Sequence, residues 1–491
     1  MAEPAAQIPF DSTPSLVTRR LEELLGRTRK AAESAGTPDL HVRLERLDRL
    51  ATAIADHEQE AVDALAADFG HRSRDASRYT DVAAVLEGIQ FARKNLRRWM
   101  KPERRSPQFP LGLLGATARV EFQPLGVVGI VSPWNFPLYL AFSPLVGVLA
   151  AGNRAMLKPS EIAPRSADVI AKIVRSAFDE TVVSVVTGGP EVGEAFCHLP
   201  FDHLVFTGGG AIAKHVMRAA AEHLVPVTLE LGGKCPVVIG RDANLAEAAG
   251  KIMAGKCLNA GQICLAPDYV FVPEARRGEL VVELRRAVEG MFDGLRENPD
   301  YTSVVNARHY ERLSALREDA RKRGAEIVEV NPKNERFSPA DTHKMPPTLV
   351  LGATDEMRIM QEEIFGPLLP IQTYRNIDDV IQYVNAHDRP LALYYLGPDE
   401  RESQAVVSRT TSGGVTVNDV LMHIAQEDLP FGGVGPSGMG AYHGREGFRT
   451  FSHAKAIYRQ AKVDFLGKLL RPPYGDRYRK LVRMMIDRAR P

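Results

Sequence analysis

The chain has 491 residues, of which 44% are apolar, and it carries 62 lysines and arginines against 61 aspartates and glutamates. This length provides for two or three domains around a large buried core. The formal net charge of +1 gives no overall field that would attract nucleic acid or an anionic membrane. We therefore expect a globular protein that acts on a small, weakly charged ligand and has no nucleic-acid partner.

The four cysteines bear on metal binding and on the redox environment. Cys197, Cys235, Cys257 and Cys264 are few for this length, and they form no C-x-x-C pair of the kind that structural zinc needs. Residues 1–20 contain no continuous apolar core like that of a secretory signal. We therefore expect no metal site and a cytoplasmic location.

Residues 122–153 contain no charged side chain, and this length is enough to cross a bilayer. Pro133, Pro137 and Pro144 would each remove a backbone hydrogen-bond donor there, and Asn135 would bury an amide in lipid. We therefore interpret the stretch as a buried strand, a loop and a core helix, and we expect no transmembrane segment.

The first hundred residues are expected to be largely helical, and a linker rich in proline and glycine leads from them into a hairpin-like stretch at residues 119–128. From residue 127 to 239, short apolar runs alternate with segments of helical period. This pattern is typical of βαβ units in a parallel, doubly wound sheet that is buried on both faces. The expected strands are residues 127–131, 155–158, 182–186, 203–206, 227–231 and 237–239, with helices at residues 166–178 and 211–223.

A second α/β unit is expected over residues 240–425, and a basic stretch closes the chain. In that stretch Leu481, Met484 and Met485 have helical spacing among arginines and lysines. The spacing is typical of a solvated or subunit-packing amphipathic helix, and a peripheral membrane contact is the alternative. Because parallel sheets bind ligands beyond the carboxyl ends of their strands, the functional site is expected there.

A glycine-rich turn follows the strand expected at residues 203–206. Gly208, Gly209, Gly210 and Ala213 match the pattern G-x-G-x-x-G/A between a strand and a helix. Glycines let the backbone approach a pyrophosphate, and the start of a helix offers unpaired N–H groups. The turn therefore predicts a dinucleotide site, and an ordinary glycine-rich turn before a helix is the alternative.

The ribose ligand of such a site has two candidates. Simple application of the motif selects Glu230, but a Gly-Gly turn follows it at a strand end and would leave it facing the crevice that also receives Cys264. Lys158 and Glu161 follow another expected strand and supply a cation and a carboxylate. We therefore favour Lys158 and Glu161 for the adenosine ribose.

Cys264 lies downstream of Glu230 in a small, nearly uncharged loop at residues 259–267. A thiolate is a strong nucleophile, and a nearby carboxylate can take a proton from the thiol or from an attacking water. Free cysteines are more often inert parts of the core, and we interpret Cys235 and Cys257 in that way. The surroundings of Cys264 favour covalent catalysis instead.

Taken together, these segments resemble the aldehyde dehydrogenase superfamily over about residues 40 to 460. Residues 264–269 (CLAPDY) and 431–444 (FGGVGPSGMGAYHG) are similar to its class 3 branch. Six motifs in the family's order make a chance similarity very improbable. These motifs are residues 133–137 (PWNFP), 158–161 (KPSE), 206–208 (FTG), 229–234 (LELGGK), 261–264 (GQIC) and 362–367 (EEIFGP).

The resemblance implies the aldehyde dehydrogenase fold, with a Rossmann-like parallel-sheet NAD domain, a second α/β catalytic domain and a small oligomerisation hairpin. It also implies a homodimer. The implied ranges are residues 1–103 with 125–232 for the NAD-binding domain, 233–430 for the catalytic domain, 104–124 with 450–475 for the bridging elements, and 476–491 for a basic tail.

The resemblance also implies the catalytic roles. Cys264 would attack the aldehyde carbon, and the side-chain amide of Asn135 with the backbone N–H of Cys264 would hold the oxyanion. Glu230 would activate the water that releases the acid. A CoA-acylating dehydrogenase is the nearest alternative, and Glu230 argues against it because that route needs no water-activating base. A non-catalytic scaffold with the same fold is the other alternative.

For the cofactor, the resemblance implies that Glu363 binds the nicotinamide ribose and Phe365 helps to position the ring. Gly209 and Gly210 stand where family members usually have Ser and Thr, so a hydroxyl contact to the phosphate is lost and backbone amides must hold it. Glu161 would repel a 2′-phosphate and therefore favours NAD. The neighbouring Arg165 leaves NADP as an alternative.

Residues 472–477 (PPYGDR) are similar to the subgroup that oxidises coniferyl aldehyde, which is therefore the substrate expected first. A broad class 3 activity on aromatic or fatty aldehydes is the alternative. Aromatic walls would suit a phenylpropenal ring, and packing roles are equally compatible with the sequence. The candidate pocket residues are Phe136, Tyr139, Tyr269, His423 and Ile424.

Overall fold

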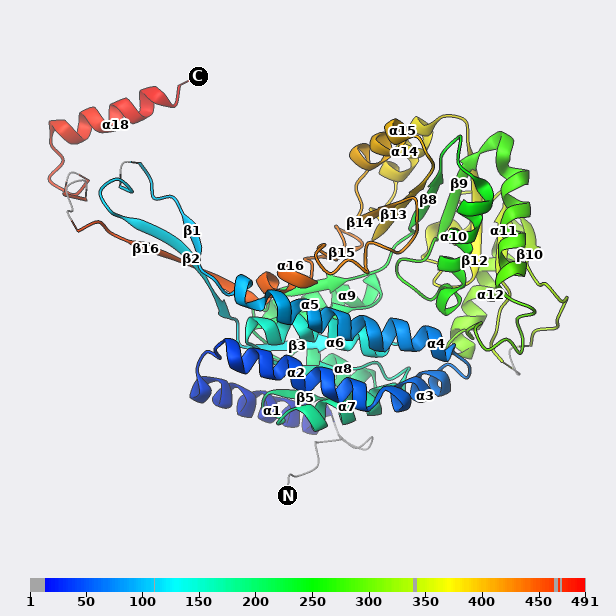
Figure 1. Ribbon diagram of the computed structural model, residues 1–491, viewed down its shortest axis with the longest axis horizontal. Helices are drawn as coiled ribbons and strands as arrows, with labels where there is room; N and C mark the ends of the chain where they lie inside the picture. Colours follow the sequence, from blue (N-terminus) through cyan, green and yellow to red (C-terminus); the bar gives the residue numbers. More distant parts are fainter. Residues whose placement is uncertain (1–13, 110, 339–341, 463–466, 469, 491) are drawn as a thin grey trace.

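The described part of the chain is built on three β-sheets, two large and one small (Figure 1). The computed structural model describes residues 14–109, 111–338, 342–462, 467–468 and 470–490. Some positions named in the sequence analysis therefore lie outside the described residues. They belong to the expected domain ranges and to residues 1–20, in which no secretory signal was expected. These positions are 1–13, 110, 339–341, 463–466, 469 and 491.

The first large sheet consists of short apolar strands that are buried on both faces, as the sequence predicted. Its strands are β3 (Val127–Val131), β4 (Arg154–Lys158), β5 (Val183–Val185), β6 (His203–Thr207), β7 (Val227–Glu230) and β15 (Gly438–Met439). They lie in the order β15-β7-β6-β3-β4-β5. Strands β3 to β7 are parallel and β15 is antiparallel to β7, so the expected parallel sheet is confirmed.

Helices cover both faces of this sheet. They are α1 (Pro14–Ala35), α2 (Leu40–Asp56), α3 (Glu58–Asp68), α4 (Arg74–Ser77), the π-helix η1 (Arg78–Ala83), α5 (Ala84–Trp99), α6 (Pro137–Ala151), α7 (Pro164–Ala177), α8 (Pro190–Cys197) and α9 (Gly210–Glu222). On one face Val128 and Ile130 pack with residues of α2, α5, α6 and α7. On the other face Val127 packs with residues of α1, α8 and α9.

The second large sheet lies beside the first (Figure 1). Its strands are β8 (Pro236–Ile239), β9 (Tyr269–Pro273), β10 (Glu326–Glu329), β11 (Thr348–Leu351), β12 (Leu368–Tyr374), β13 (Ala392–Leu396) and β14 (Gly414–Val417). Their order is β10-β11-β12-β9-β8-β13-β14, and β10 is antiparallel to β11. The helices of this unit are α10 (Leu245–Cys257), η2 (Leu258–Gly261), η3 (Glu274–Arg276), α11 (Arg277–Met291), α12 (Ala307–Lys322), α13 (Arg358–Gln361), α14 (Ile377–Ala386) and α15 (Glu400–Arg409).

The chain passes between the two large sheets over a very short distance. Strand β7 ends at Glu230 in the first sheet, and β8 begins at Pro236 in the second. The carboxyl ends of β3, β6 and β7 are adjacent because these strands are neighbours in the sheet. Loops from these ends therefore meet loops of the second sheet, and the functional site is formed there.

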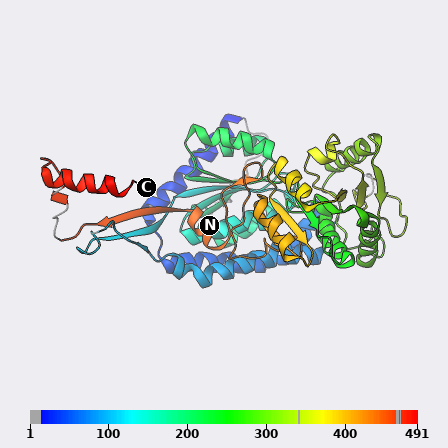
Figure 2. The ribbon, with the colours of Figure 1, turned by 90° about the horizontal axis from the view of Figure 1, so that it is seen from above.

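The third sheet forms an arm that extends from the body of the molecule (Figures 1 and 2). It consists of β1 (Glu103–Arg105), β2 (Thr117–Pro124) and β16 (Ser452–Arg459), with β2 in the middle. The expected hairpin at residues 119–128 is wrong, because β2 pairs with β1 and β16 while β3 joins the large sheet. Strand β2 alternates apolar and polar residues and is only partly buried, whereas β3 is a continuous apolar run in the buried sheet.

A short helix and a terminal helix complete the fold. Helix α16 (Gly444–Thr450) precedes β16, and the basic helix α18 (Asp476–Arg488) lies at the far end of the arm (Figures 1 and 2). Among the described residues, no helix combines the length and the apolar character that crossing a bilayer requires. Residues 122–153 form the end of β2, then β3, a loop and α6, which confirms that interpretation.

Arg43 fixes the helix that carries part of the site. Its buried guanidinium in α2 donates from Nη1 to the carbonyls of Ala150 and Ala151, at 3.0 and 2.8 Å, and from Nε to that of Pro38 at 3.0 Å. These bonds cap the carboxyl end of α6, where Gly152 takes a φ of +93°. A Cβ on Gly152 would lie 2.8 Å from the guanidinium, so glycine leaves room for this cap.

We expect Arg43→Met to lower the free energy of unfolding by about 2–4 kcal/mol, because buried carbonyls lose their donor. Urea unfolding followed by circular dichroism measures this change. The control is Arg49→Met on the same helix, whose exposed pair with Glu45 contributes at most about 1 kcal/mol. Equal losses in both variants would contradict the capping role.

Candidate active site

One cavity of about 820 Å³ lies where loops of the two large sheets meet. Its size suits a drug-sized organic ligand, and aromatic and aliphatic side chains form most of its wall. The cavity brings together residues that are far apart in the sequence. The candidate site residues that line it are Asn135, Phe136, Tyr139, Gly208, Gly209, Glu230, Cys264, Glu363, Phe365 and Ile424.

The loop that carries Cys264 is held in place by buried hydrogen bonds. Helix α10 ends at Cys257, and in the following turn Asn259 takes a φ of +49°. The fully buried Gln262 donates from Nε2 to the carbonyls of Asn259 and Ser303, at 2.9 and 3.0 Å. Its Oε1 accepts from the N–H of Val305 at 2.9 Å. Gln262 belongs to the GQIC motif, but nothing in the sequence indicated that its side chain would bond these three main-chain groups.

Asn135 lies in the loop after β3 and is 4% exposed. Its side-chain Nδ2 donates to the carbonyl of Gln262 at 3.2 Å, so the amide already contacts the loop of Cys264. Its own carbonyl accepts from Arg72 Nη1 at 2.7 Å and from Asn259 Nδ2 at 3.1 Å. The two loops are therefore joined by direct hydrogen bonds beside the thiol.

Arg72 is a positioning residue that the sequence did not reveal. It is 2% exposed, and its guanidinium pairs with Asp81 at 2.7 Å between Nη2 and Oδ2. It also lies over the rings of Phe69 and Phe136, 4.8 and 4.9 Å from their centroids. No spacing rule links Arg72 to Asn135. Arg72 lies in the loop between α3 and α4, and Asp81 lies in η1.

Cys264 and Glu230 both lie in a desolvated environment. Burial, with further effects of Glu363 and Glu230, raises the pKa of Cys264 above the usual range of a thiol. Glu230 is 2% exposed, and burial raises its pKa well above the usual value. Both of its carboxyl oxygens lack a hydrogen-bond partner among the described residues. A potential nucleophile and a potential proton acceptor thus share one cavity.

Glu363 lies against the Gly-Gly turn that follows β7. A Cβ on Gly232 would lie 2.1 Å from Glu363 Oε1, so a larger residue there would displace this carboxylate. Burial, and next Asp268, raise the pKa of Glu363 to about 8. Its Oε1 is buried and has no hydrogen-bond partner in the part of the chain that the structure describes. This unpaired oxygen in the cavity wall is suited to accept a hydrogen bond from a hydroxyl group of a ligand.

The LELGGK and EEIFGP motifs are interlocked. Lys234 Nζ donates to the carbonyls of Ile359 and Glu362, at 2.8 and 3.1 Å, and pairs with Asp268. Asp268 Oδ1 accepts from the N–H of Ile364 at 3.0 Å. Phe365 follows with a φ of +50°, and its ring meets Trp134 edge-on at 5.4 Å. These contacts fix the cavity wall that carries Glu363.

The glycine turn after β6 is open on one side. A Cβ on Gly208 would lie 2.7 Å from the ring of Phe206, so that position is tight. Around Gly209 and Gly210, by contrast, no atom lies within 4 Å of an added Cβ. Gly209 is the N-cap of α9 and offers no side-chain hydrogen bond there. The free helix start is accessible to an anionic group.

Lys158 and Glu161 lie outside the described cavity lining, at and after the end of the neighbouring strand β4. Lys158 Nζ lies 3.4 Å from Glu161 Oε2 and donates to the carbonyl of Pro159 at 2.8 Å. Burial lowers the pKa of Lys158. In the sheet register Val131 pairs with both Lys158 and Phe206, so these two strand ends flank β3. The strand ends thus form a continuous edge.

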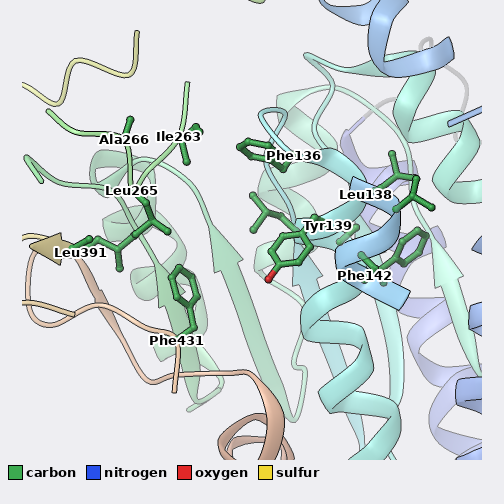
Figure 3. Close-up of a cluster of buried hydrophobic side chains, with 14 of the residues drawn as sticks. Phe136, Leu138, Tyr139, Phe142, Ile263, Leu265, Ala266, Leu391 and Phe431 are labelled. Carbon is green, nitrogen blue, oxygen red and sulfur yellow. The ribbon is translucent and has the colours of Figure 1, made fainter. Parts of the chain in front are cut away.

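Aromatic side chains face each other across the cavity. Phe136 and Tyr139 point from the start of α6 toward Ile263, Leu265 and Phe431 (Figure 3). Tyr139 Oη also lies 3.1 Å from His443 Nε2. This contact gives His443 a structural partner in α6.

Two of the expected pocket residues need correction, since neither Tyr269 nor His423 is among the described residues that line the cavity. Tyr269 is 4% exposed in β9, where its ring packs edge-on against Phe271 and Tyr383. The Nδ1 atom of His423 lies 2.9 Å from Oγ1 of Thr416, within hydrogen-bonding distance. In the sequence His423 lies between the lining residues Met422 and Ile424, whereas Tyr269 lies further along the chain, after the lining residue Leu265.

A profile of the aldehyde dehydrogenase family matches residues 1–457. A probable coniferyl aldehyde dehydrogenase of Caulobacter vibrioides is 54% identical over 462 residues, which cover 94% of this chain and 95% of the relative. A coniferyl aldehyde dehydrogenase of Pseudomonas sp. is 50% identical over 468 residues, which cover 95% and 96%. The structure of substrate-bound Staphylococcus aureus AldH matches with a TM-score of 0.88 at 37% identity, covering 95% of this chain and 99% of that chain.

These similarities extend over nearly the whole chain, and the fold agrees with them. The resemblance inferred from the ordered motifs is therefore confirmed. The chain belongs to the aldehyde dehydrogenase family and is an NAD(P)-dependent enzyme that oxidises an aldehyde.

Proposed function

We propose that the enzyme oxidises coniferyl aldehyde to the carboxylic acid with NAD, through a covalent intermediate on Cys264. The observation that carries this proposal is the shared cavity, in which Cys264 and Glu230 lie beside aromatic walls. A phenylpropenal is a flat, apolar molecule that suits such walls. The names of the relatives from Caulobacter and Pseudomonas support the same substrate.

In the first step Cys264 Sγ attacks the aldehyde carbon and forms a thiohemiacetal. The thiol proton passes to ionised Glu230, because the raised pKa of this residue makes it a stronger base than an ordinary carboxylate. The oxyanion is held by Asn135 Nδ2 and the backbone N–H of Cys264. A preorganised donor of this kind contributes about 3 kcal/mol to the rate.

In the second half of the reaction Glu230 first releases the thiol proton to solvent and then activates water. The thiohemiacetal has by then lost two electrons and become a thioester, which water must hydrolyse. Glu230 has no hydrogen-bond partner among the described residues, so it is free to bind this water. It takes a proton from the water, the acid leaves, and Cys264 recovers its thiol.

The described residues fit a dinucleotide along the strand ends. The open backbone at Gly209 suits the pyrophosphate, Lys158 and Glu161 suit the adenosine ribose, and the orphaned Oε1 of Glu363 suits the nicotinamide ribose. Phe365 positions the ring beside the cavity. When bound, the nicotinamide accepts the hydride that the thiohemiacetal releases. We favour NAD because Glu161 accepts a ribose 2′-hydroxyl and repels a 2′-phosphate.

We also propose a cytoplasmic homodimer. The four cysteines are free, which suits a reducing compartment. Strand β16 is an eight-residue edge of the arm sheet, and its outer side has no strand partner in the described part of the chain. An open edge of this length is a template for pairing with a second copy. The domain ranges given above remain part of this proposal.

The substrate proposal is tested by NADH formation with coniferyl aldehyde, benzaldehyde and a long-chain alkanal, with NADP in place of NAD in a second series. We expect the highest kcat/KM for coniferyl aldehyde with NAD. Cys264→Ala should abolish turnover and still bind NAD, while Cys257→Ala should remain active. A preference for the alkanal, or a requirement for CoA, would contradict the proposal.

Glu230→Gln should slow the first burst of NADH less than the steady-state rate, which it should lower by about 10²- to 10⁴-fold. The thiol proton can also pass to solvent, whereas hydrolysis of the thioester needs the general base. In the wild type, only ionised Glu230 accepts a proton from water, so steady-state turnover should rise as the pH increases through its raised pKa. Stopped-flow absorbance over a range of pH measures both effects. Glu222→Gln, on the exposed surface of α9, is the control. An unchanged steady state in Glu230→Gln would show that another base serves.

Gly209→Ser should tighten NAD binding by about 3- to 10-fold, because a hydroxyl enters open space beside the phosphate site. Fluorescence titration with NADH gives the dissociation constant. Gly209→Ala is the matched control, since it adds the same Cβ without a hydroxyl. Equal tightening in both variants would attribute the effect to backbone entropy, and weaker binding in Gly209→Ser would refute the expected contact.

A further inference from the structure

The cavity contains a carboxyl group that the proposed mechanism does not use. Glu427 lines the same cavity as Cys264 and is partly buried. It lies in the loop between β14 and Phe431, and the adjoining lining residues from that loop, such as Leu421 and Ile424, are apolar. A carboxylate in an apolar wall is costly unless a partner compensates for its lost hydration.

The position of Glu427 is fixed from two sides. Its carboxylate lies against α5, where a Cβ on Gly88 would be 3.2 Å from Glu427 Oε1. Its backbone carbonyl lies against Gly444, whose φ is +46° and where an added Cβ would be 2.2 Å from the oxygen. Both neighbours are glycines that leave room for this residue. The carboxylate is therefore held at the cavity wall.

The described residues supply no cation to Glu427. Burial, and next the carboxylate of Glu87, raise its pKa to about 7. Neither a hydrogen bond nor an ion pair from another described residue reaches its carboxylate oxygens. Glu87 lines the same cavity and is exposed. Glu427 thus has an acceptor group without a donor among the described residues, and it lines both the large cavity and a small one of about 20 Å³ beside α5 and α6. A ligand donor can reach it only from the large cavity, because the small one has room for no more than a water molecule.

Tyr442 lies in the same part of the cavity wall as Glu427. It is 1% exposed and lines the cavity, but its hydroxyl has no hydrogen-bond partner among the described residues. Burial raises the pKa of Tyr442, and Glu230, Cys264 and Glu427 contribute to the shift. The ring therefore lies within electrostatic reach of the catalytic pair and of Glu427. Buried hydroxyls normally have a partner, and the small cavity that Tyr442 also lines has room for a water molecule. The wall around Glu427 therefore combines polar groups with apolar ones.

We propose that Glu427 accepts a hydrogen bond from the ring hydroxyl of a 4-hydroxyaryl propenal whose aldehyde carbon is at Cys264. The inference rests on the proposed function and names the substrate class within it. The aromatic walls hold the flat ring, and Glu427 distinguishes a hydroxylated ring from a plain one. A site built to bond a hydroxyl discriminates strongly against an analogue without it, because the site's own polar group is then left unpaired.

A cationic aldehyde is the competing ligand, since Glu87 and Glu427 together carry negative charge. An aliphatic ammonium would leave the rings of Phe136, Tyr139 and Phe431 without an aromatic partner. The described cavity is mainly apolar, and a neutral phenol needs less desolvation there than an ammonium does. The observations therefore favour the phenol.

The test is the ratio of kcat/KM for coniferyl aldehyde to kcat/KM for 3-methoxycinnamaldehyde, which lacks only the ring hydroxyl. We expect a ratio of about 10 to 100 in the wild type, close to one in Glu427→Leu, and intermediate in Glu427→Gln, which keeps an acceptor oxygen. Because both substrates are measured on the same protein, partial misfolding does not move the ratio. Asp428→Asn changes the neighbouring exposed carboxylate outside the described cavity lining and should keep the wild-type ratio.

Three outcomes would overturn the inference. In the first outcome, Glu427→Leu keeps the wild-type ratio while coniferyl aldehyde remains the preferred substrate. Glu427 then does not bind the ring hydroxyl, but the proposed function still holds. If the wild type oxidises 4-aminobutanal more efficiently than coniferyl aldehyde, the two carboxylates serve a cation. If the wild type prefers a long-chain alkanal, the proposed function fails and this inference fails with it.

Discussion

Desolvation of a thiol and a carboxyl in one cavity is the constraint on which the rest of the structure depends. Glu230 is almost fully buried without a described hydrogen-bond partner, and Cys264 lies in the same cavity. An unpaired carboxyl in such a place costs folding free energy. The protein offsets this cost elsewhere, through two large sheets packed with helices and through loops that are fixed by hydrogen bonds. A raised carboxyl pKa is the chemical property that this arrangement produces.

Several buried contacts hold the loops around this pair. Gln262 fixes the Cys264 loop, the Arg72–Asp81 pair supports the backbone of Asn135, and Lys234 joins two motifs across the cavity wall. Each of these side chains bonds main-chain carbonyls of a segment that is distant in sequence. Removing one would leave buried carbonyls unpaired, so each contact supports both stability and the geometry of the site.

The sequence predicted those parts of the fold that follow from local pattern. The strands at residues 127–131 and 203–206 are confirmed, because a short apolar run beside segments of helical period is typical of a strand buried on both faces. The hairpin at residues 119–128 is wrong, because pairing of β2 with β16 is a long-range choice that local spacing does not encode. Tyr269 was assigned to the pocket because it lies near the Cys264 motif in the sequence. It belongs to the buried strand β9, and its ring packs in the core.

The site shows the same division. Motif spacing selected Cys264, Glu230 and Asn135, which the structure brings to one cavity. The contacts made by Gln262 and Arg72 were not predictable, because they join segments through the fold rather than through sequence. The reacting groups lie in short motifs, whereas their support depends on tertiary contacts.

The most direct test of the account is mass spectrometry of Glu230→Gln after mixing with coniferyl aldehyde and NAD. The account predicts a mass increase of one acyl group, which fragmentation assigns to Cys264 rather than to Cys257 in the tryptic peptide between Lys256 and Arg276. A protein that turns over without any adduct, or with the acyl group on another residue, would contradict the covalent role of Cys264.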